Sequence, residues 1–130
     1  MSEILVPVSP GEVVDKITIL RIKSARITDA AKLANVRAEL EILERTWHES
    51  VYGRHDIRAD EVALQSVNER LWDIEDRIRD KERAGSFDAG FVELARAVYI
   101  ENDERAAIKK RINTALGSAI VEEKSYAAYR

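Results

Sequence analysis

Two short polar strings, at residues 68–76 and 98–105, carry carboxylates and amides at spacings that could do chemistry. Their oxygen atoms would suit a hard cation such as Mg²⁺, which prefers carboxylate, carbonyl and amide oxygens. Carboxylates placed where two helices meet need a cation or a hydrogen-bonding partner, because burying an unpaired charge is costly. The side chains of this candidate metal set are Glu75, Asp76, Asn102 and Asp103.

Cations close to these strings could neutralise an anionic group. A metal together with Lys109 or Arg105 would suit phosphoryl or pyrophosphate chemistry, so Glu75, Asp76 and Lys109 are the catalytic candidates of a possible Mg-dependent hydrolase. Two alternatives stay open. Either the carboxylates pair with Arg79, Arg105 or Lys109 as a structural network, or the cations and amides form a metal-free pocket for a small anion.

Helical geometry determines which of these side chains can meet. Residues three, four and seven apart share one face of a helix, so Asn68 and Glu75 share a ridge, as do Tyr99 and Asn102 on the next helix. A hairpin turn near Ser86 would bring the two ridges together, with one helix from the N-terminal half and the tail as further walls. The ligand-binding candidates are Asp15, Lys16, Lys23, Asn68, Trp72, Tyr99, Asn102, Arg105, Lys124 and Tyr126.

Hydrophobic residues recur at helical spacing through most of the chain, which predicts an all-α fold. The last two helices are near 28 residues, or about 42 Å, so we expect a four-helix antiparallel bundle dominated by a long C-terminal helical hairpin. Short extended segments at the N- and C-termini could pair with each other. The expected helices cover residues 10–27, 30–49, 57–84 and 88–116, with a loose loop at 50–56 and a tail at 118–130.

Local signals support these boundaries. Ser9 is a candidate N-cap before Pro10, and Glu12 would complete a capping box. Gly117 is a natural stop for the last helix. The second helix carries a heptad seam that we interpret as intramolecular core, with a dimer surface as the alternative. The seam residues are Leu33, Val36, Leu40, Leu43 and Trp47.

Composition excludes several classes of protein. The 130 residues suggest one domain, and 45% hydrophobic and 35% charged residues indicate a folded chain with a charged surface. A net charge of −3 argues against non-specific nucleic-acid binding, and no apolar run approaches the roughly 20 residues of a membrane span. The absence of cysteine excludes disulfides and thiolate metal sites, and it fits a cytoplasmic location. His48 and His55 are too few for a histidine metal site, and no glycine-rich phosphate loop or metalloprotease motif is present.

Five strings that cover nearly the whole chain, apart from residues 50–59, resemble a bacterial domain family of unknown function. They are VPVSPGE at 6–12, DKITIL at 15–20, VNxxLWxIED at 67–76, ARxVYxxNDER at 95–105 and EEKSY at 122–126. The resemblance implies a small, mostly helical bacterial protein and transfers no activity. It places the family's motif strings on the polar stretches described above rather than on the heptad seam.

Two functions from different classes follow, and the sequence leaves open whether the protein is an enzyme. One is a small-ligand site for a phosphorylated or anionic metabolite in a polar pocket between the first, third and fourth helices. The other is a non-enzymatic helical interaction or dimerisation module, a possible homodimer, with a structural polar network. A site of the chorismate-mutase kind, with cations and carboxylates inside a helical bundle, is a third possibility by analogy alone.

Overall fold

The computed structural model describes residues 2–129, and it is all-α, as expected. Its four helices are α1 (Pro10–Arg26), α2 (Ala30–Glu49), α3 (Arg58–Ala84) and α4 (Ala89–Leu116). These bounds differ from the expected ranges by one residue at most. No strand occurs among residues 2–129.

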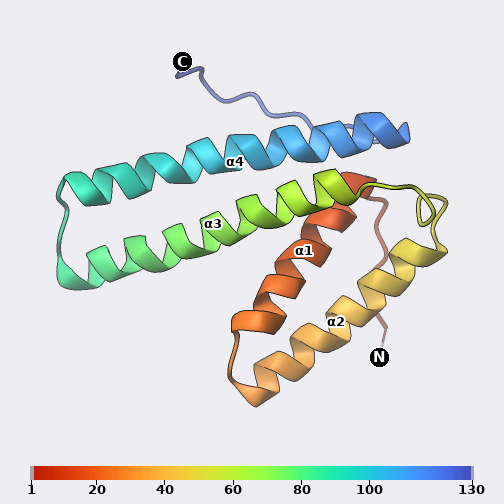
Figure 1. Cartoon of the computed structure of the whole chain (residues 1–130), viewed down its shortest axis with the longest axis horizontal. Coiled ribbons are helices and arrows are strands. Elements are labelled where there is room, and N and C mark those ends of the chain that lie inside the picture. Colours follow the sequence, from red (N-terminus) through yellow and green to blue (C-terminus); the bar gives the residue numbers. More distant parts are fainter. Residues whose placement is uncertain (1, 130) are drawn as a thin grey trace.

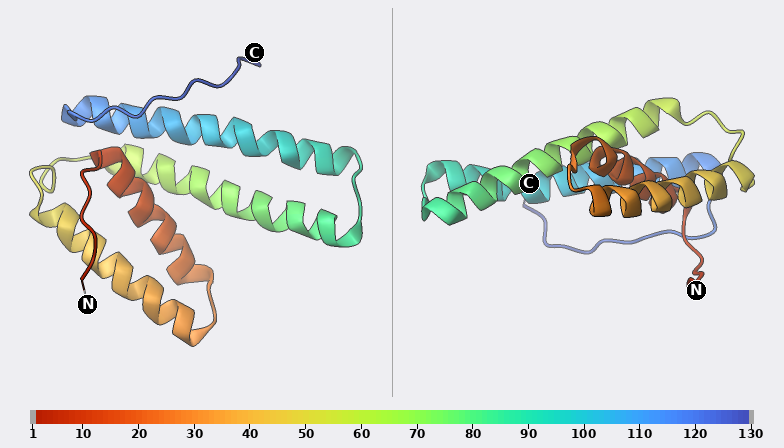
Figure 2. Two further views of the ribbon diagram at one scale, coloured as in Figure 1. Left: turned by 180° about the vertical axis from the view of Figure 1, so that it is seen from behind. Right: turned by 90° about the horizontal axis from the view of Figure 1, so that it is seen from below.

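The helices form two antiparallel hairpins of unequal length that meet at a steep angle (Figure 1). The longer hairpin consists of α3 and α4, and α1 packs against both of them. Among the described residues the backbone of α2 neighbours only that of α1, and α2 reaches the central core through the side chain of Trp47. The tip of the long hairpin extends well beyond α1 and α2, which Figure 2 shows from behind and from below.

Helix ends form largely as the local signals predict. The Ser9 side chain accepts a hydrogen bond from the backbone N–H of Glu12 at 3.2 Å, and Asp88 caps α4 through the N–H of Phe91 at 3.0 Å. Gly117 ends α4 in the left-handed conformation at φ 67°. The capping box is incomplete, because the Glu12 carboxylate binds Lys109.

The hydrophobic core lies where α1 crosses the long hairpin. Its fully buried cluster consists of Val14, Leu64, Val67, Ile108 and Ile112. By contrast, α2 contains no fully buried residue, and the residues of its heptad seam are only half-buried. The seam of α2 therefore covers α1 from one side, and its last residue, Trp47, packs against the buried cluster.

The two terminal segments lie along different helices. The N-terminal segment points away beside α2, whereas the C-terminal tail runs back along α4 (Figure 1). Ile4, Leu5 and Val6 are exposed. The extended segments are therefore present, but within residues 2–129 they are not paired with each other as strands.

Candidate functional site

A buried carboxylate, Asp15, is the centre of the polar side chains that the structure brings together. Asp15 lies on the face of α1 that packs against the long hairpin, and it is 1% exposed. It accepts hydrogen bonds from Asn68 Nδ2 at 3.0 Å, from Arg105 Nε at 2.9 Å and from Arg105 Nη2. Asn68 also donates to Thr18 Oγ1 at 3.0 Å. Asp15, Asn68 and Arg105 thus join α1, α3 and α4 at one point.

The ion pair between Asp15 and Arg105 is bidentate, and a bidentate pair fixes the orientation of the two side chains as well as balancing their charges. The hydrogen bond to Asp15 is the main cause that raises the pKa of Arg105, against the opposing effect of burial. Among the described residues, every buried side-chain nitrogen and oxygen has a hydrogen-bond partner. The network around Asp15 is therefore satisfied by the protein itself, as a stable buried polar cluster requires.

A second cation, Lys109, connects α4 to both ends of the chain. Its Nζ lies 2.6 Å from Glu12 Oε2 at the start of α1 and 3.0 Å from Glu122 Oε2 in the tail. Burial opposes the charged form of Lys109, but hydrogen bonds to the two glutamates outweigh it and raise the pKa of the amine. Lys109 is thus a neutralised, largely buried cation.

The start of α1 is held against α4 at very short range by Gly11. Its backbone N–H donates to Asn113 Oδ1 at 2.7 Å. A Cβ atom at this position would lie 2.6 Å from the carbonyl oxygen of Lys109 and 2.8 Å from Asn113 Oδ1, so only glycine permits the approach. Sequence reasoning missed the roles of Gly11 and Asn113. The available signal was a glycine inside the first turn of a well-capped helix.

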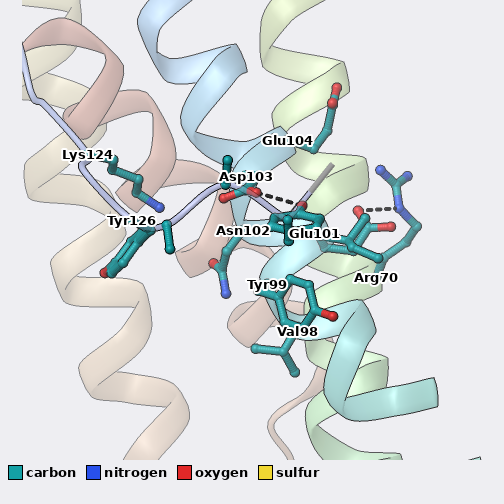
Figure 3. A pocket seen from close by; sticks show the side chains of 13 residues that line it. Arg70, Val98, Tyr99, Glu101, Asn102, Asp103, Glu104, Lys124 and Tyr126 are labelled. Atoms are coloured by element: carbon teal, nitrogen blue, oxygen red, sulfur yellow. Dashed lines mark hydrogen bonds and ion pairs between the residues drawn. The ribbon is translucent and has the colours of Figure 1, made fainter. Parts of the chain in front are cut away.

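An open groove of about 1210 Å³ lies between α4 and the C-terminal tail (Figure 3). Tyr99, Asn102 and Asp103 of α4 line one side, and Lys124 and Tyr126 of the tail line the other. The tail returns to α4 at its end, where the hydroxyl of Tyr129 donates to Asp103 Oδ2 at 2.7 Å and its ring packs edge-on against Tyr99. Four of the ligand-binding candidates, Tyr99, Asn102, Lys124 and Tyr126, therefore meet in this groove.

The remaining ligand-binding candidates lie outside both the buried network around Asp15 and the groove between α4 and the tail. Lys16 is exposed and Lys23 is half-buried. Trp72 lies under the guanidinium of Arg26, 5.8 Å from the ring centroid. The predicted candidates are thus divided between the buried network, the tail groove and the open surface.

The carboxylates of the expected metal set also lie on separate surfaces. Glu75 forms an exposed ion pair with Arg79 one turn along α3, and Asp76 is exposed. Asp103 lies in the tail groove. Among residues 2–129, no group of three or more histidine, aspartate and glutamate side chains is arranged to hold a metal ion. The scatter follows from the rotation of the helices about their axes: Asn68 faces α1, whereas Asn102 and Asp103 face the tail.

Comparison with known proteins gives a family but no activity. Residues 4–129 match the family model described as "Family of unknown function (DUF6165)". No curated protein and no solved structure matches the chain. In the described part of the chain, no helix combines the length and apolarity needed to cross a bilayer. Because the match covers nearly all of the chain, the protein belongs to this family of unknown function, as its sequence strings lead us to expect.

Proposed function

We propose that the protein is a non-enzymatic helical interaction module that self-associates through the tip of its long hairpin. The observation that carries the proposal is an open groove of about 690 Å³ at this tip, between α3 and α4, where α1 and α2 do not reach. Ile74, Leu94 and Ala97 give the groove an apolar lining. An apolar surface between two helices is usually covered by a third element, and within residues 2–129 no third element lies over this part of the hairpin (Figure 2).

The outer face of the tip adds further exposed apolar area. Phe87 is 60% exposed and Val92 is 53% exposed, and the Phe87 ring packs edge-on against Phe91 at a centroid distance of 5.2 Å. Exposed apolar side chains that lie near one another are typical of protein interaction surfaces. The tip is therefore better suited to protein association than an ordinary charged helix face.

Charge supports a second copy of the same chain as the occupant. The groove is lined by Arg77, Asp80 and Lys81 on α3 and by Glu93 on α4. Asp80 pairs with Arg83 and Lys81 pairs with Asp88, whereas Arg77 and Glu93 form no ion pair within residues 2–129. In a twofold dimer the same patch faces itself, so the basic side of one hairpin can lie against the acidic side of its partner. Two such hairpins would form a four-helix bundle with a shared core, which is a stable arrangement for helices of this length.

The buried polar cluster supports a structural rather than a catalytic role. An anionic ligand at Arg105 would have to displace Asp15, and one at Lys109 would have to displace Glu12 and Glu122. Breaking a buried ion pair costs several kcal/mol, roughly 3–5. These cations act in our proposal as clamps between helices, and association takes place at the hairpin tip.

Light scattering coupled to size-exclusion chromatography tests this proposal with two alanine-to-glutamate changes. Ala97→Glu places a charge in the tip groove, whereas Ala107→Glu places the same charge on an exposed position of α4 away from that groove. We expect a dimer for the wild type and for Ala107→Glu, and a monomer for Ala97→Glu with unchanged helical circular dichroism. A wild-type protein that stays monomeric at about 1 mM, or an Ala97→Glu dimer, would contradict it.

A further inference from the structure

The C-terminal tail and α4 enclose a second binding surface, which is independent of the hairpin tip. We propose that the tail groove binds an extended peptide segment rich in arginine or lysine, and that the tail pairs with this segment as a β-strand. Figure 3 shows the arrangement, with Lys124 and Tyr126 on the tail and Tyr99, Asn102 and Asp103 on α4. The proposal depends on how the tail is held, on its free backbone and on the charge of the groove.

The tail is attached at its two ends and stands away from α4 between them. Glu122 is held by Lys109 at 3.0 Å, and Tyr129 is held by Asp103 and Tyr99. The space of about 1210 Å³ lies between these anchors. A segment of peptide can therefore lie between tail and helix without displacing either anchor.

The backbone of the tail is available for strand pairing. Residues 121–128 are exposed and contain no proline, and within the described chain none of their backbone groups forms a hydrogen bond with another backbone group. An exposed, extended segment with unpaired N–H and C=O groups is the template that β-strand addition uses. Eight extended residues span about 26 Å, so the tail could pair with a peptide of six to eight residues.

Charge indicates which peptide would bind. Five charged residues line the groove, and the acidic ones outnumber the basic ones: Glu101, Asp103 and Glu104 against Arg70 and Lys124. Arg70 already pairs with Glu101 at 3.0 Å. In the part of the chain that the structure describes, neither Asp103 nor Glu104 forms an ion pair with a cation. The groove therefore favours a cationic partner.

Aromatic rings strengthen this preference. Lys124 Nζ lies over the ring of Tyr126, 5.8 Å from its centroid, so this ring already acts as a partner for a cation, and Tyr126 is 83% exposed. Tyr99 and Tyr126 line opposite sides of the groove. Arginine side chains bind such ring faces and carboxylates together. An acidic or purely apolar segment, such as the chain's own residues 3–8, lacks the matching charge.

Fluorescence anisotropy with a labelled octapeptide of alternating arginine and valine tests the proposal on the full chain. We expect saturable binding, and at least about tenfold weaker binding by Glu104→Arg. Asp76→Arg is the matched control, because Asp76 is likewise an exposed acid on a helix but lies outside the groove. Equal binding of a glutamate–valine octapeptide, no binding at about 1 mM, or equal loss in both variants would overturn the proposal.

Strand pairing is tested separately by proline, which removes a backbone N–H. Adjacent residues in an extended chain direct their N–H groups to opposite sides, so only one of Ala127 and Ala128 can donate to the bound peptide. We therefore expect one of the two variants, Ala127→Pro or Ala128→Pro, to weaken peptide binding about tenfold. Ala119→Pro, before the groove, should leave it unchanged. If spermine, which has cationic groups but no peptide backbone, competes as well as the octapeptide does, strand pairing is wrong. Self-association at the hairpin tip is unaffected by each of these results.

Discussion

At the scale of single residues, Asp15 is the position where we expect a substitution to lower the stability of the protein most. Replacing it by alanine leaves the Arg105 guanidinium without its bidentate partner at a site where α1, α3 and α4 meet. We expect Asp15→Ala to lower the free energy of unfolding by about 3–5 kcal/mol, measured by urea denaturation. Glu75→Ala is the control, because the Glu75–Arg79 pair is exposed and should contribute less than about 1 kcal/mol. Equal losses in the two variants would contradict a special role of Asp15.

Gly11 leads to a second prediction at this scale, because it lies inside a helix and packs closely against α4. An alanine Cβ would overlap the Lys109 carbonyl at 2.6 Å, and backbone cannot move aside as a flexible side chain can. We expect Gly11→Ala to destabilise the protein by about 1–3 kcal/mol in thermal or urea unfolding. In the matched change Gly90→Ala the nearest atom is Lys81 Nζ at 3.1 Å, the end of a flexible chain, so its effect should be smaller. A larger loss at Gly90 would count against this explanation.

Interactions within one turn of a helix can be predicted from the sequence, whereas partners that are distant in the sequence cannot. Ser9, Asp88 and Gly117 were predictable because a cap acts within one turn of its own helix. Arg70 and Glu101 pair at the same level of the long hairpin, as an antiparallel hairpin with its turn near Ser86 requires. Asp15 and Arg105 are 90 residues apart, and their pairing depends on how α1 crosses α4. The spacing of residues within one helix gives no information about how that helix crosses another.

At the scale of elements, the start of α4 depends on one carboxylate. Asp88 accepts a hydrogen bond from the N–H of Phe91 and pairs with Lys81, and these two interactions lower its pKa, the backbone bond most. A lowered folded-state pKa means that the stabilisation is complete above the ordinary aspartate value of about 3.9 and is lost as the pH falls through the folded value. We expect Asp88→Asn to be less stable than the wild type at pH 7. The difference should shrink when both are unfolded by urea between about pH 4 and pH 2, and a constant difference would contradict the assignment.

The heptad seam of α2 shows that a sequence can predict a helix correctly without predicting which elements the helix packs against. Its spacing identifies a helix with one apolar face, and that helix is present at Ala30–Glu49. The spacing does not say which elements the face contacts: in the described chain α1 is the helix beside it, and Trp47 also packs against the core cluster. The same reasoning explains the expected metal set: Glu75 and Asp103 lie on real helices, but the helices present them on different sides.

At the scale of the whole molecule, Lys109 connects parts that are far apart in the sequence. It binds Glu12 at the first turn of α1 and Glu122 in the tail, so this one charge holds the first part of the tail along α4, while Tyr129 holds its end. The groove that we propose as a peptide site exists only while the tail keeps this position. The folded shape of the chain end is therefore coupled to the protonation of one largely buried amine.

Removing that charge should release the tail. We expect Lys109→Met to lower the backbone ¹⁵N order parameters of residues 121–128 below about 0.6, the range of flexible segments, while the helices keep theirs. Lys110→Met is the matched control, because Lys110 is the exposed neighbour and forms neither ion pair. Unchanged order parameters in Lys109→Met, or equal loosening in both variants, would show that Tyr129 alone holds the tail.

The raised pKa of Lys109 gives the same prediction a pH dependence. The stabilisation by a group whose pKa is raised in the folded state is complete below the unfolded value, about 10.4 for lysine, and is lost as the pH rises through the folded value. We therefore expect the wild-type tail to stay ordered up to about pH 10 and to loosen above it, followed by the fluorescence of a dye attached near Tyr126. Lys109→Met should lack this transition because its tail is already loose at pH 7. A transition of equal size in the variant would assign the effect to the tyrosines, whose ordinary pKa lies near 10.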